Sequence, residues 1–296
     1  MTETGRTETP VELSVIIAAR NAADVLPALL TSLAAQTWTG AWEVIVVDNG
    51  SVDGTGALAE TFTSLLPHLR VIDASRQPGQ AYARNAGVAV ASGTSVAFVD
   101  ADDEVEPTYI AAMGQALRRN RFVAARLDCV TLNAGWVRHS RPPPGPVDGL
   151  GAALGWLPLS AGCSLGIRRD LFLNEGGFNA ELPPAEDIDL CWRLLLDGVE
   201  LTLVPDAVIR YRYRTRFYDI FGQARGYGRS VPNLYRRYRD RGMPRRHGMR
   251  IVRFWLGPIR RLINVRTKAD LALIVYLVGF RVGLVEGCWR ARVLYV

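Results

Sequence analysis

The chain has 296 residues, of which 49% are hydrophobic and 22% charged, and this composition excludes a disordered chain. Its four cysteines lie far apart without metal-ligand spacing and its three histidines are scattered, so neither a disulfide framework nor a histidine-rich metal site is expected. The net charge of +6 hides an asymmetry: residues 1–209 carry 14 arginines against 25 acidic residues, whereas residues 210–266 carry 17 arginines against two.

Strand and helix patterns alternate in the first hundred residues. Continuous apolar runs, the pattern of strands buried on both faces, lie at 11–19, 43–48, 69–74 and 95–100. Between these runs, apolar spacing and capping residues predict helices that begin at Asp24, that run from about Thr55 to Leu66, and that span 82–91. A further helix is predicted to start at Tyr109. This alternation predicts a parallel, doubly wound sheet.

Charged residues follow the predicted strands at one edge of the sheet. Asp48 and Asp100 close two strands and Arg20 stands just beyond a third, so the three are expected to converge where such sheets bind ligands. Residues 100–104 hold four acidic side chains, which suggests a divalent cation bound together with a phosphate. A solvated acidic turn before the next helix explains the same residues without a metal.

Two nucleotide-binding fingerprints are missing from this edge. The turn after the first strand has no glycine, so the GxGxxG dinucleotide motif is absent where it would be needed. The sequence also lacks a Walker-type GxxxxGK[ST] loop. A dinucleotide-binding enzyme and a P-loop enzyme are therefore not expected.

Five stretches in the same order resemble those of the family 2 glycosyltransferases, which have the GT-A nucleotide-sugar-binding fold. They are residues 14–21 (SVIIAARN), 46–55 (VVDNGSVDGT), 79–87 (GQAYARNAG), 98–103 (FVDADD), and 176–194 with its GGFN and EDIDLCWRL segments. The resemblance covers about residues 11–214. It implies an α/β protein with a mostly parallel sheet, helices on both faces, and a basic helical C-terminal extension.

The resemblance also implies a domain organisation. Residues 1–10 would be a flexible tail and residues 11–214 the catalytic domain, with a nucleotide-sugar half at about 11–130 and an acceptor half at about 150–214. The proline-rich stretch 141–146 would form the loop between these halves, because it interrupts regular structure. Residues 215–296 would form the basic extension.

The resemblance implies that the chain moves a sugar from a nucleoside-diphosphate sugar to an acceptor hydroxyl (hexosyltransferase type, EC 2.4). A Mg²⁺ or Mn²⁺ ion would assist the leaving diphosphate, held by the DxD aspartates Asp102 and Asp100. The donor would be bound by Ala19, Arg20, Asn21, Asp48, Ser51, Arg84, Asp100 and Ala101. For Arg84, a helix-surface pair with local hydrogen bonds remains an alternative, and Asp53 is expected to cap a helix rather than to bind a ligand.

The acceptor hydroxyl must lose its proton as it attacks, and a positioned carboxylate is the usual base. By the resemblance this base is Asp187, with Glu186 as the alternate, and a single in-line displacement would invert the anomeric centre. Helix capping explains both residues without catalysis. Many relatives place a histidine in the next strand, but this chain has Arg210 and Arg212 there, so an arginine could partly replace a metal ligand.

The basic C-terminal segment is open to three interpretations. Tyrosines interleaved with arginines could bind nucleic acid, but no nucleic-acid motif accompanies them. The segment could lie on anionic lipid, or its helices could pack on the acidic domain or in an oligomer interface. The apolar stretch 271–287 is interrupted by Arg281 after ten residues, which is too short to cross a bilayer, so an interfacial or packed helix is expected.

Residues 1–10 lack the pattern of a secretory signal, so we expect a cytoplasmic protein that could lie peripherally at the inner face of the plasma membrane. The expected partners are a nucleoside-diphosphate sugar and an acceptor that is a glycan, a lipid-linked molecule or a small molecule, in the synthesis of envelope polysaccharide, glycolipid or secondary glycoside. Two alternatives remain: a GT-A-like binding module without turnover, and a sugar nucleotidyltransferase, whose glycine-rich first loop is absent here.

Overall fold

The computed structural model describes residues 11–66, 68–245 and 249–295, so the expected tail at 1–10 lies outside the described residues. The chain divides into two compact units, which are described separately. The first contains residues up to 125 together with 163–177 and 204–209, and the second contains residues 126–162, 178–203 and those from 210 onwards. These borders do not follow the expected domain borders, which stay predictions.

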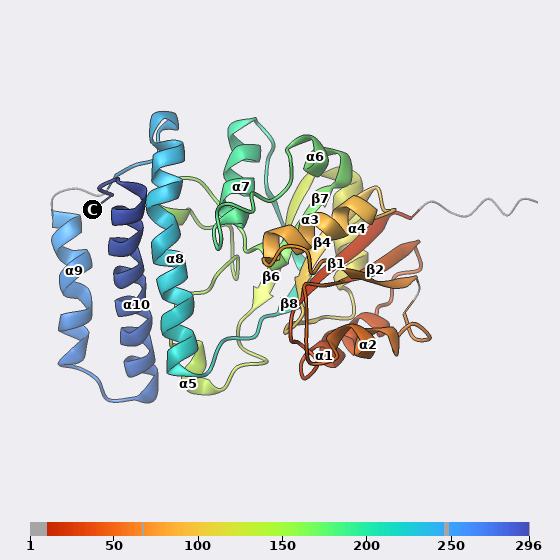
Figure 1. Ribbon diagram of the computed structural model, residues 1–296, viewed down its shortest axis with the longest axis horizontal. Coiled ribbons are helices and arrows are strands. Elements are labelled where there is room, and N and C mark those ends of the chain that lie inside the picture. The colour runs from red at the N-terminus through yellow and green to blue at the C-terminus, as the bar shows by residue number, and fades with distance from the viewer. Residues whose placement is uncertain (1–10, 67, 246–248, 296) are drawn as a thin grey trace, which may run out of the picture. The chain divides into compact units, whose positions relative to one another are not determined.

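A mixed sheet of eight strands in the order β3-β2-β1-β4-β7-β6-β8-β5 is the centre of the first unit (Figure 1). Strands β1 to β4 pair in parallel, whereas β7 runs antiparallel to both β4 and β6. The strands are β1 Leu13–Ala19, β2 Trp42–Asp48, β3 Leu69–Asp73, β4 Ser95–Asp100, β5 Glu104–Val105, β6 Phe122–Asp128, β7 Leu165–Arg168 and β8 Thr202–Arg210. The expected mostly parallel α/β sheet is confirmed.

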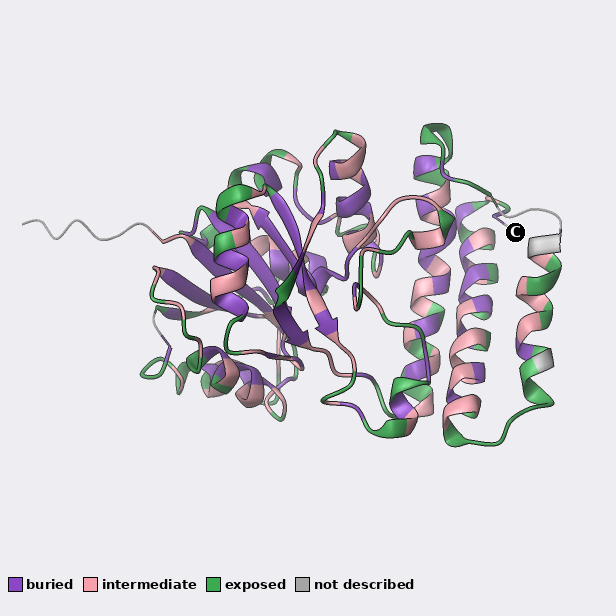
Figure 2. Ribbon diagram, turned by 180° about the vertical axis from the view of Figure 1, so that it is seen from behind, coloured by how far each residue is buried: buried purple, intermediate pink, exposed green. Residues whose placement is uncertain are grey.

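The central strands are buried on both faces, as their continuous apolar sequences require. Val15, Ile16 and Ile17 of β1 have no exposed surface, and the same holds for residues 44–47 of β2. Figure 2 shows these strands as buried along almost their whole length. Adjacent residues on a strand point to opposite faces, so helices must cover both sides.

Helices α3 and α6 cover one face. Ile16 of β1 and Phe98 of β4 are register partners and point the same way. A Cβ on Gly87 of α3 would come within 2.5 Å of Ile16 Cγ2, which shows how closely this helix approaches the sheet. Phe98 packs against Phe172 of α6 with ring centroids 5.5 Å apart.

Helices α1 and α4 cover the opposite face. Gly166 of β7 pairs with Ala97, the neighbour of Phe98, and a Cβ on Gly166 would meet Met113 of α4 at 2.5 Å. Gln36, just beyond α1, joins the two helices: its amide donates to the Glu106 carbonyl and its Oε1 accepts from the Ile110 amide, both at 2.8 Å. The sheet is therefore wound on both faces, as predicted.

The helices of the first unit differ from the predictions mainly at their ends. They are α1 Leu26–Ala34, α2 Thr55–Glu60, α3 Gln80–Val90, α4 Tyr109–Arg119 and α6 Arg169–Asn174. The expectation that Asp24 caps α1 was wrong, because the N-cap is Val25 without a side-chain hydrogen bond. The second helix ends at Glu60 and not at Leu66.

The second unit is mainly helical. Its helices are α5 Gly135–Arg138, α7 Glu186–Leu196, α8 Phe217–Tyr238, α9 Met249–Leu262 and α10 Lys268–Ala291. Short 3₁₀ turns lie at Ala153–Gly155, Gly162–Ser164 and Arg239–Arg241. Of the turn Gly162–Ser164, only Gly162 belongs to the second unit. The proline-rich stretch 141–146 forms neither helix nor strand, as expected. Helices α8 and α9 both pack against α10, so the expected helical C-terminal extension is present (Figure 1).

Glycines allow α8 and α10 to touch backbone to backbone. Gly279, Gly283 and Gly287 of α10 face backbone carbonyls of α8, and a Cβ on Gly283 would lie 1.9 Å from the Arg225 oxygen. Gly228 of α8 is equally close to the Phe280 carbonyl. Small residues spaced by four are known to let helix backbones approach in this way.

By length and composition alone, α10 could cross a membrane, which is weak evidence for such a role. The sequence prediction counted only the ten apolar residues before Arg281 as too short to cross a bilayer, but α10 continues through Arg281 to Ala291, so its length does not exclude a span. The guanidinium of Arg281 is buried and donates to the carbonyls of Phe254 in α9 and Leu277 in α10. About two fifths of the apolar window is buried in the protein, which also fits a packed helix.

Replacing Gly283 by alanine is expected to destabilise the protein by about 1–3 kcal/mol, because the added methyl overlaps the Arg225 carbonyl and the helices must separate. Gly222→Ala in α8 is the matched control, since its Cβ meets nothing within 4 Å and alanine favours a helix by about 1 kcal/mol. Urea unfolding followed by circular dichroism measures both. Equal midpoints for the two variants would contradict the close packing.

Candidate active site

The loops that follow β1 and β2 are tied together by hydrogen bonds. The Asn21 amide donates to Ser51 Oγ, and Asn21 Oδ1 accepts from the Val52 amide, each at 2.9 Å. The Ala23 amide donates to Asp53 Oδ2 at 3.0 Å. Arg20 is exposed between these contacts. The predicted donor residues of the two loops therefore share one rigid edge of the sheet.

The expectation that Asp53 caps α2 was wrong, because Gly54 holds the N-cap position, but Asp53 does have a structural role in this pair of loops. Its Oδ1 accepts from both the amide and the hydroxyl of Thr55 at the start of α2. The hydrogen bond from the Thr55 hydroxyl, together with that from the Ala23 amide, lowers the pKa of Asp53. The N-cap position itself is held by Gly54, which adopts a left-handed conformation with φ 84°.

Asp48 ends β2 beside Ala19, its register partner at the end of β1. Its Oδ1 accepts from the Ser51 amide at 2.8 Å, which fixes the carboxylate, and Asp48 stays partly exposed. A Cβ at position 56 would lie 2.9 Å from Asp48 Oδ2, so a larger residue in place of Gly56 would displace this carboxylate. The contact between Asp48 and Ser51 supports their joint assignment to the donor site.

Asn49 was missed by the sequence reasoning. It is buried, its amide donates to the carbonyls of Ala74 and Gln77 at 2.6 and 2.8 Å, and its Oδ1 accepts from the Gly79 amide at 2.8 Å. These bonds hold the segment before α3 against the end of β2. The polar turn that follows β2 in the sequence was the only signal, and it does not show which side chain points inwards.

Arg84 is buried against Asp100 at the end of β4. Arg84 Nη2 lies 2.7 Å from Asp100 Oδ1, and Gln80, one turn earlier on α3, donates to the same oxygen at 2.7 Å. The Arg84 side chain is only 4% exposed, so the alternative of a helix-surface pair was wrong. Arg84 therefore orients the carboxylate of Asp100, which is one of the two predicted metal ligands.

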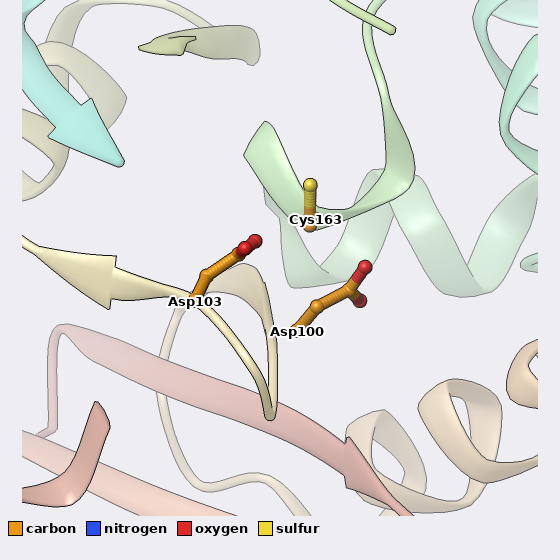
Figure 3. Close-up of side chains that lie close together, drawn as sticks. All are labelled: Asp100, Asp103 and Cys163. Atoms are coloured by element: carbon orange, nitrogen blue, oxygen red, sulfur yellow. The ribbon is translucent and has the colours of Figure 1, made fainter. Parts of the chain in front are cut away.

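Asp100, Asp103 and Cys163 form a cluster whose ligand atoms lie within 4.8 Å of one another (Figure 3). Asp103 and Cys163 are buried, and the fully buried Tyr109 lies beside them. Burial, together with the nearby Cys163 and Asp103, raises the pKa of the Tyr109 phenol. Sequence reasoning named neither Asp103 nor Cys163 as a site residue: Asp103 falls outside the DxD spacing, and Cys163 has no local signal.

This donor set fits a divalent cation. Carboxylate oxygens suit Mg²⁺ and Mn²⁺, whereas the thiol adds a ligand that softer ions prefer. Asp102 lies between the two clustered aspartates in the sequence and is partly exposed, and Ala101 is buried. The cluster therefore supports a metal site at the end of β4, while the assignment of Asp102 as a ligand stays a prediction.

The predicted base lies in the second unit, at the start of α7. Asp187 is partly exposed, with Oδ2 accepting from the Gly162 amide at 3.0 Å and Oδ1 from the Ile188 amide at 2.7 Å. Glu186 is buried. Asp189 has a structural role, because it is fully buried and bound by Arg193, Arg237 and Tyr238. Of the three acidic residues, Asp187 is therefore the best placed to meet a substrate.

Arg210 ends β8, and both Arg210 and Arg212 are partly exposed. Both belong to the second unit, whereas the cluster around Asp100 belongs to the first. The role of either arginine in place of a metal-site histidine stays a prediction.

Solved structures similar to this chain are glycosyltransferases. A mannosyltransferase from Pyrobaculum calidifontis, in complex with GDP-Man and Mn²⁺, has a TM-score of 0.65 at 18% identity and covers 96% of this chain and 88% of that one. TarS 1–349 from S. aureus, in complex with UDP, has a TM-score of 0.56 at 19% identity and covers 97% of this chain and 93% of that one. At these identities the similarity shows the GT-A fold alone.

Curated relatives match parts of the sequence. An uncharacterized glycosyltransferase, YibD, of Escherichia coli K12 is 42% identical over 42% of this chain and 34% of its own length. A pre-mycofactocin glycosyltransferase of Mycobacterium tuberculosis is 26% identical over 79% and 49%. The succinoglycan biosynthesis protein ExoU of Rhizobium meliloti is 28% identical over 66% and 60%. This chain thus spans between a third and three fifths of their lengths.

The family model described as glycosyl transferase family 2 matches residues 14–174, from β1 through α6. The match contains the loops after β1 and β2, the Arg84–Asp100 pair and the cluster around Asp103. It covers more than half of the sequence, and the chain therefore belongs to glycosyl transferase family 2.

Proposed function

We propose that this protein is an inverting glycosyltransferase that moves a sugar from a nucleoside-diphosphate sugar to an acceptor hydroxyl. The observation that carries the proposal is the carboxyl edge of the parallel strands, where Asp48 and Asp100 are held in fixed positions by Ser51 and Arg84. Ligands of open α/β sheets bind at such an edge. The proposal is also supported by the solved relatives, whose complexes contain GDP-Man with Mn²⁺ or UDP.

On the donor side, Asp48 would accept hydrogen bonds from the nucleoside, and the exposed Arg20 would lie near it. Asp100 and Asp102 would hold a Mg²⁺ or Mn²⁺ ion, and Arg84 and Gln80 orient Asp100 for this task. When bound, the ion would neutralise charge on the leaving diphosphate. Asp103 is the second clustered carboxylate available to the ion.

On the acceptor side, Asp187 would take the proton from the attacking hydroxyl. The hydroxyl oxygen forms a bond to the anomeric carbon while the bond from that carbon to the diphosphate oxygen breaks. One displacement of this kind inverts the anomeric centre. The amide of Gly162, which is 25 residues away in the sequence, donates to Asp187 Oδ2 and holds the carboxylate in one orientation, so the contacts of Asp187 are not those of local helix capping alone.

We also propose that the C-terminal helices rest on an anionic membrane surface at the cytoplasmic side. Val252, Leu256, Ile259 and Ile263 are exposed at helical spacing along α9 and just beyond its end. A second exposed stripe on α10 comprises Leu271, Val278, Val282, Val285 and Trp289. Arg253, Arg261 and Arg266 are exposed on α9 and just after it, which gives this surface charge complementarity to anionic lipid.

The donor proposal predicts that one nucleoside diphosphate among UDP, GDP, dTDP and CDP raises the melting temperature in the presence of Mn²⁺. The stabilisation is expected to approach about 3 kcal/mol at 100 times the Kd. Asp102→Asn is expected to weaken the metal-dependent binding about tenfold or more, because a ligand is lost. Asp170→Asn is the control, since Asp170 is exposed at the start of α6.

Two results of this panel would change the proposal. If the metal-dependent rise in melting temperature is lost in Asp103→Asn but fully retained in Asp102→Asn, the metal ligand is Asp103 and not Asp102. If no nucleotide stabilises the folded protein in the presence of Mn²⁺, the donor proposal fails.

Asp187→Asn is expected to lower kcat by about 10²–10⁴-fold while the affinity for the donor stays the same, because only the proton acceptor is removed. The value of kcat is measured as the release of nucleoside diphosphate from a sugar donor that carries the nucleotide identified in the binding panel. Water serves as the acceptor where no other acceptor is known. Asp197→Asn, at the exposed end of the same helix, is the control. A loss confined to Glu186→Gln would instead assign the base to Glu186.

The membrane proposal predicts sedimentation with vesicles that contain phosphatidylglycerol and little with pure phosphatidylcholine. The double variant Leu256→Gln and Ile259→Gln is expected to lose most of this binding, since it makes the α9 stripe polar. Val52→Gln changes a residue that is 91% exposed in the first unit and serves as the control. Binding that is the same for neutral and anionic vesicles would count against the proposal.

A further inference from the structure

Arg141 is a buried cation whose partners are all neutral. It is 7% exposed and donates from Nε to Ser140 Oγ, from Nη1 to Gln223 Oε1 at 2.7 Å, and from Nη2 to the Arg214 carbonyl. No carboxylate of the described chain forms a salt bridge with it. A buried charge without a counter-charge is costly, so an anion bound beside Arg141 would offset part of this cost.

The guanidinium of Arg141 also has N–H groups that its protein partners do not use. A guanidinium carries five N–H groups, and three of those of Arg141 are used by Ser140, Gln223 and Arg214. Its face lies over the Tyr213 ring at 4.9 Å from the centroid, which holds the group in one orientation. Two N–H groups therefore remain for a ligand in a fixed position.

Tyrosines surround the guanidinium. Burial lowers the pKa of Arg141, and the phenols that act on it in the opposite sense belong to Tyr211, Tyr213, Tyr276 and Tyr227. Arg141, Gln223 and these tyrosines line a small pocket whose wall is completed by residues 142–144. The lining contains no acidic residue, and all of it belongs to the second unit.

We propose that this Arg141 pocket binds a phosphate group, with the two remaining N–H groups of Arg141 and the phenol O–H of Tyr276 as donors to its oxygens. A guanidinium fork pairs well with phosphate oxygens, and neighbouring phenols supply donors without adding negative charge. The phosphate is that of a water-soluble phosphate compound or that of a lipid. The site is independent of the proposed sugar transfer and does not rest on it.

The test is binding of inorganic phosphate and of dihexanoyl phosphatidic acid to the full-length protein, followed by calorimetry and by melting temperature. Arg141→Gln is expected to weaken the binding at least tenfold. Tyr276→Phe, which keeps the ring in α10 and removes one phenol O–H, is expected to weaken it severalfold in a folded protein. If Arg141→Gln fails to fold, Tyr276→Phe decides the question.

Arg281→Gln is the matched control. Arg281 is a second buried arginine of the same unit that donates to the Phe254 and Leu277 carbonyls and does not line the pocket. Its replacement is expected to lower stability and to leave phosphate affinity unchanged. The proposal is overturned if neither probe binds the folded wild-type protein, if Tyr276→Phe binds as well as wild type, or if Arg281→Gln loses affinity as much as Arg141→Gln.

The two probes distinguish the source of the phosphate. Much tighter binding of the short-chain phosphatidic acid, lost in Arg141→Gln, supports the site with a lipid phosphate as its ligand. Equal affinity for both probes supports the site with a water-soluble phosphate compound. Failure of sugar transfer would leave these results unchanged, because they are read from binding alone.

Discussion

The ion pair between Arg84 and Asp100 is the interaction on which the donor side of this protein depends. Arg84 is buried by the sheet and by α3, so loss of the Asp100 charge would leave a desolvated guanidinium without its counter-charge. Breaking a fully buried pair costs about 3–5 kcal/mol, and the cost here is smaller because the Asp100 side chain is 22% exposed. That exposed part is what remains available to a ligand.

The neighbouring contacts extend this constraint along the sheet edge. Asn49 fixes the segment that leads into α3, α3 carries Gln80 and Arg84, and these two side chains determine where the Asp100 carboxylate points. The order matters physically, because each contact positions the donor of the next one. A site built in this way is preorganised before any ligand arrives, which reduces the entropy lost on binding.

Much of the fold could be predicted because the central strands are apolar on both faces, and that pattern survives in the sequence as continuous runs. Asp48 and Asp100 could be placed at one edge for the same reason, since both follow such runs. Three features could not be predicted, because they depend on segments that come together only in the folded protein. They are the inward direction of Asn49, the burial of Arg84 and the approach of Cys163 to Asp103. The burial of Arg281 inside α10 could not be predicted either, because a charge in a sequence does not show that its donors are satisfied by carbonyls of α9 and α10.

The backbone contact between α8 and α10 has a mechanical consequence. Helices that meet through long side chains can slide, because rotamers adjust, but glycines against carbonyls leave nothing to adjust. At the far end of α8, Tyr238 donates to Asp189 in the first turn of α7, the helix that begins with Glu186 and Asp187. A shift of α10 would therefore displace α8 as well, and the hydrogen bond from Tyr238 to Asp189 would pass part of that displacement to the first turn of α7.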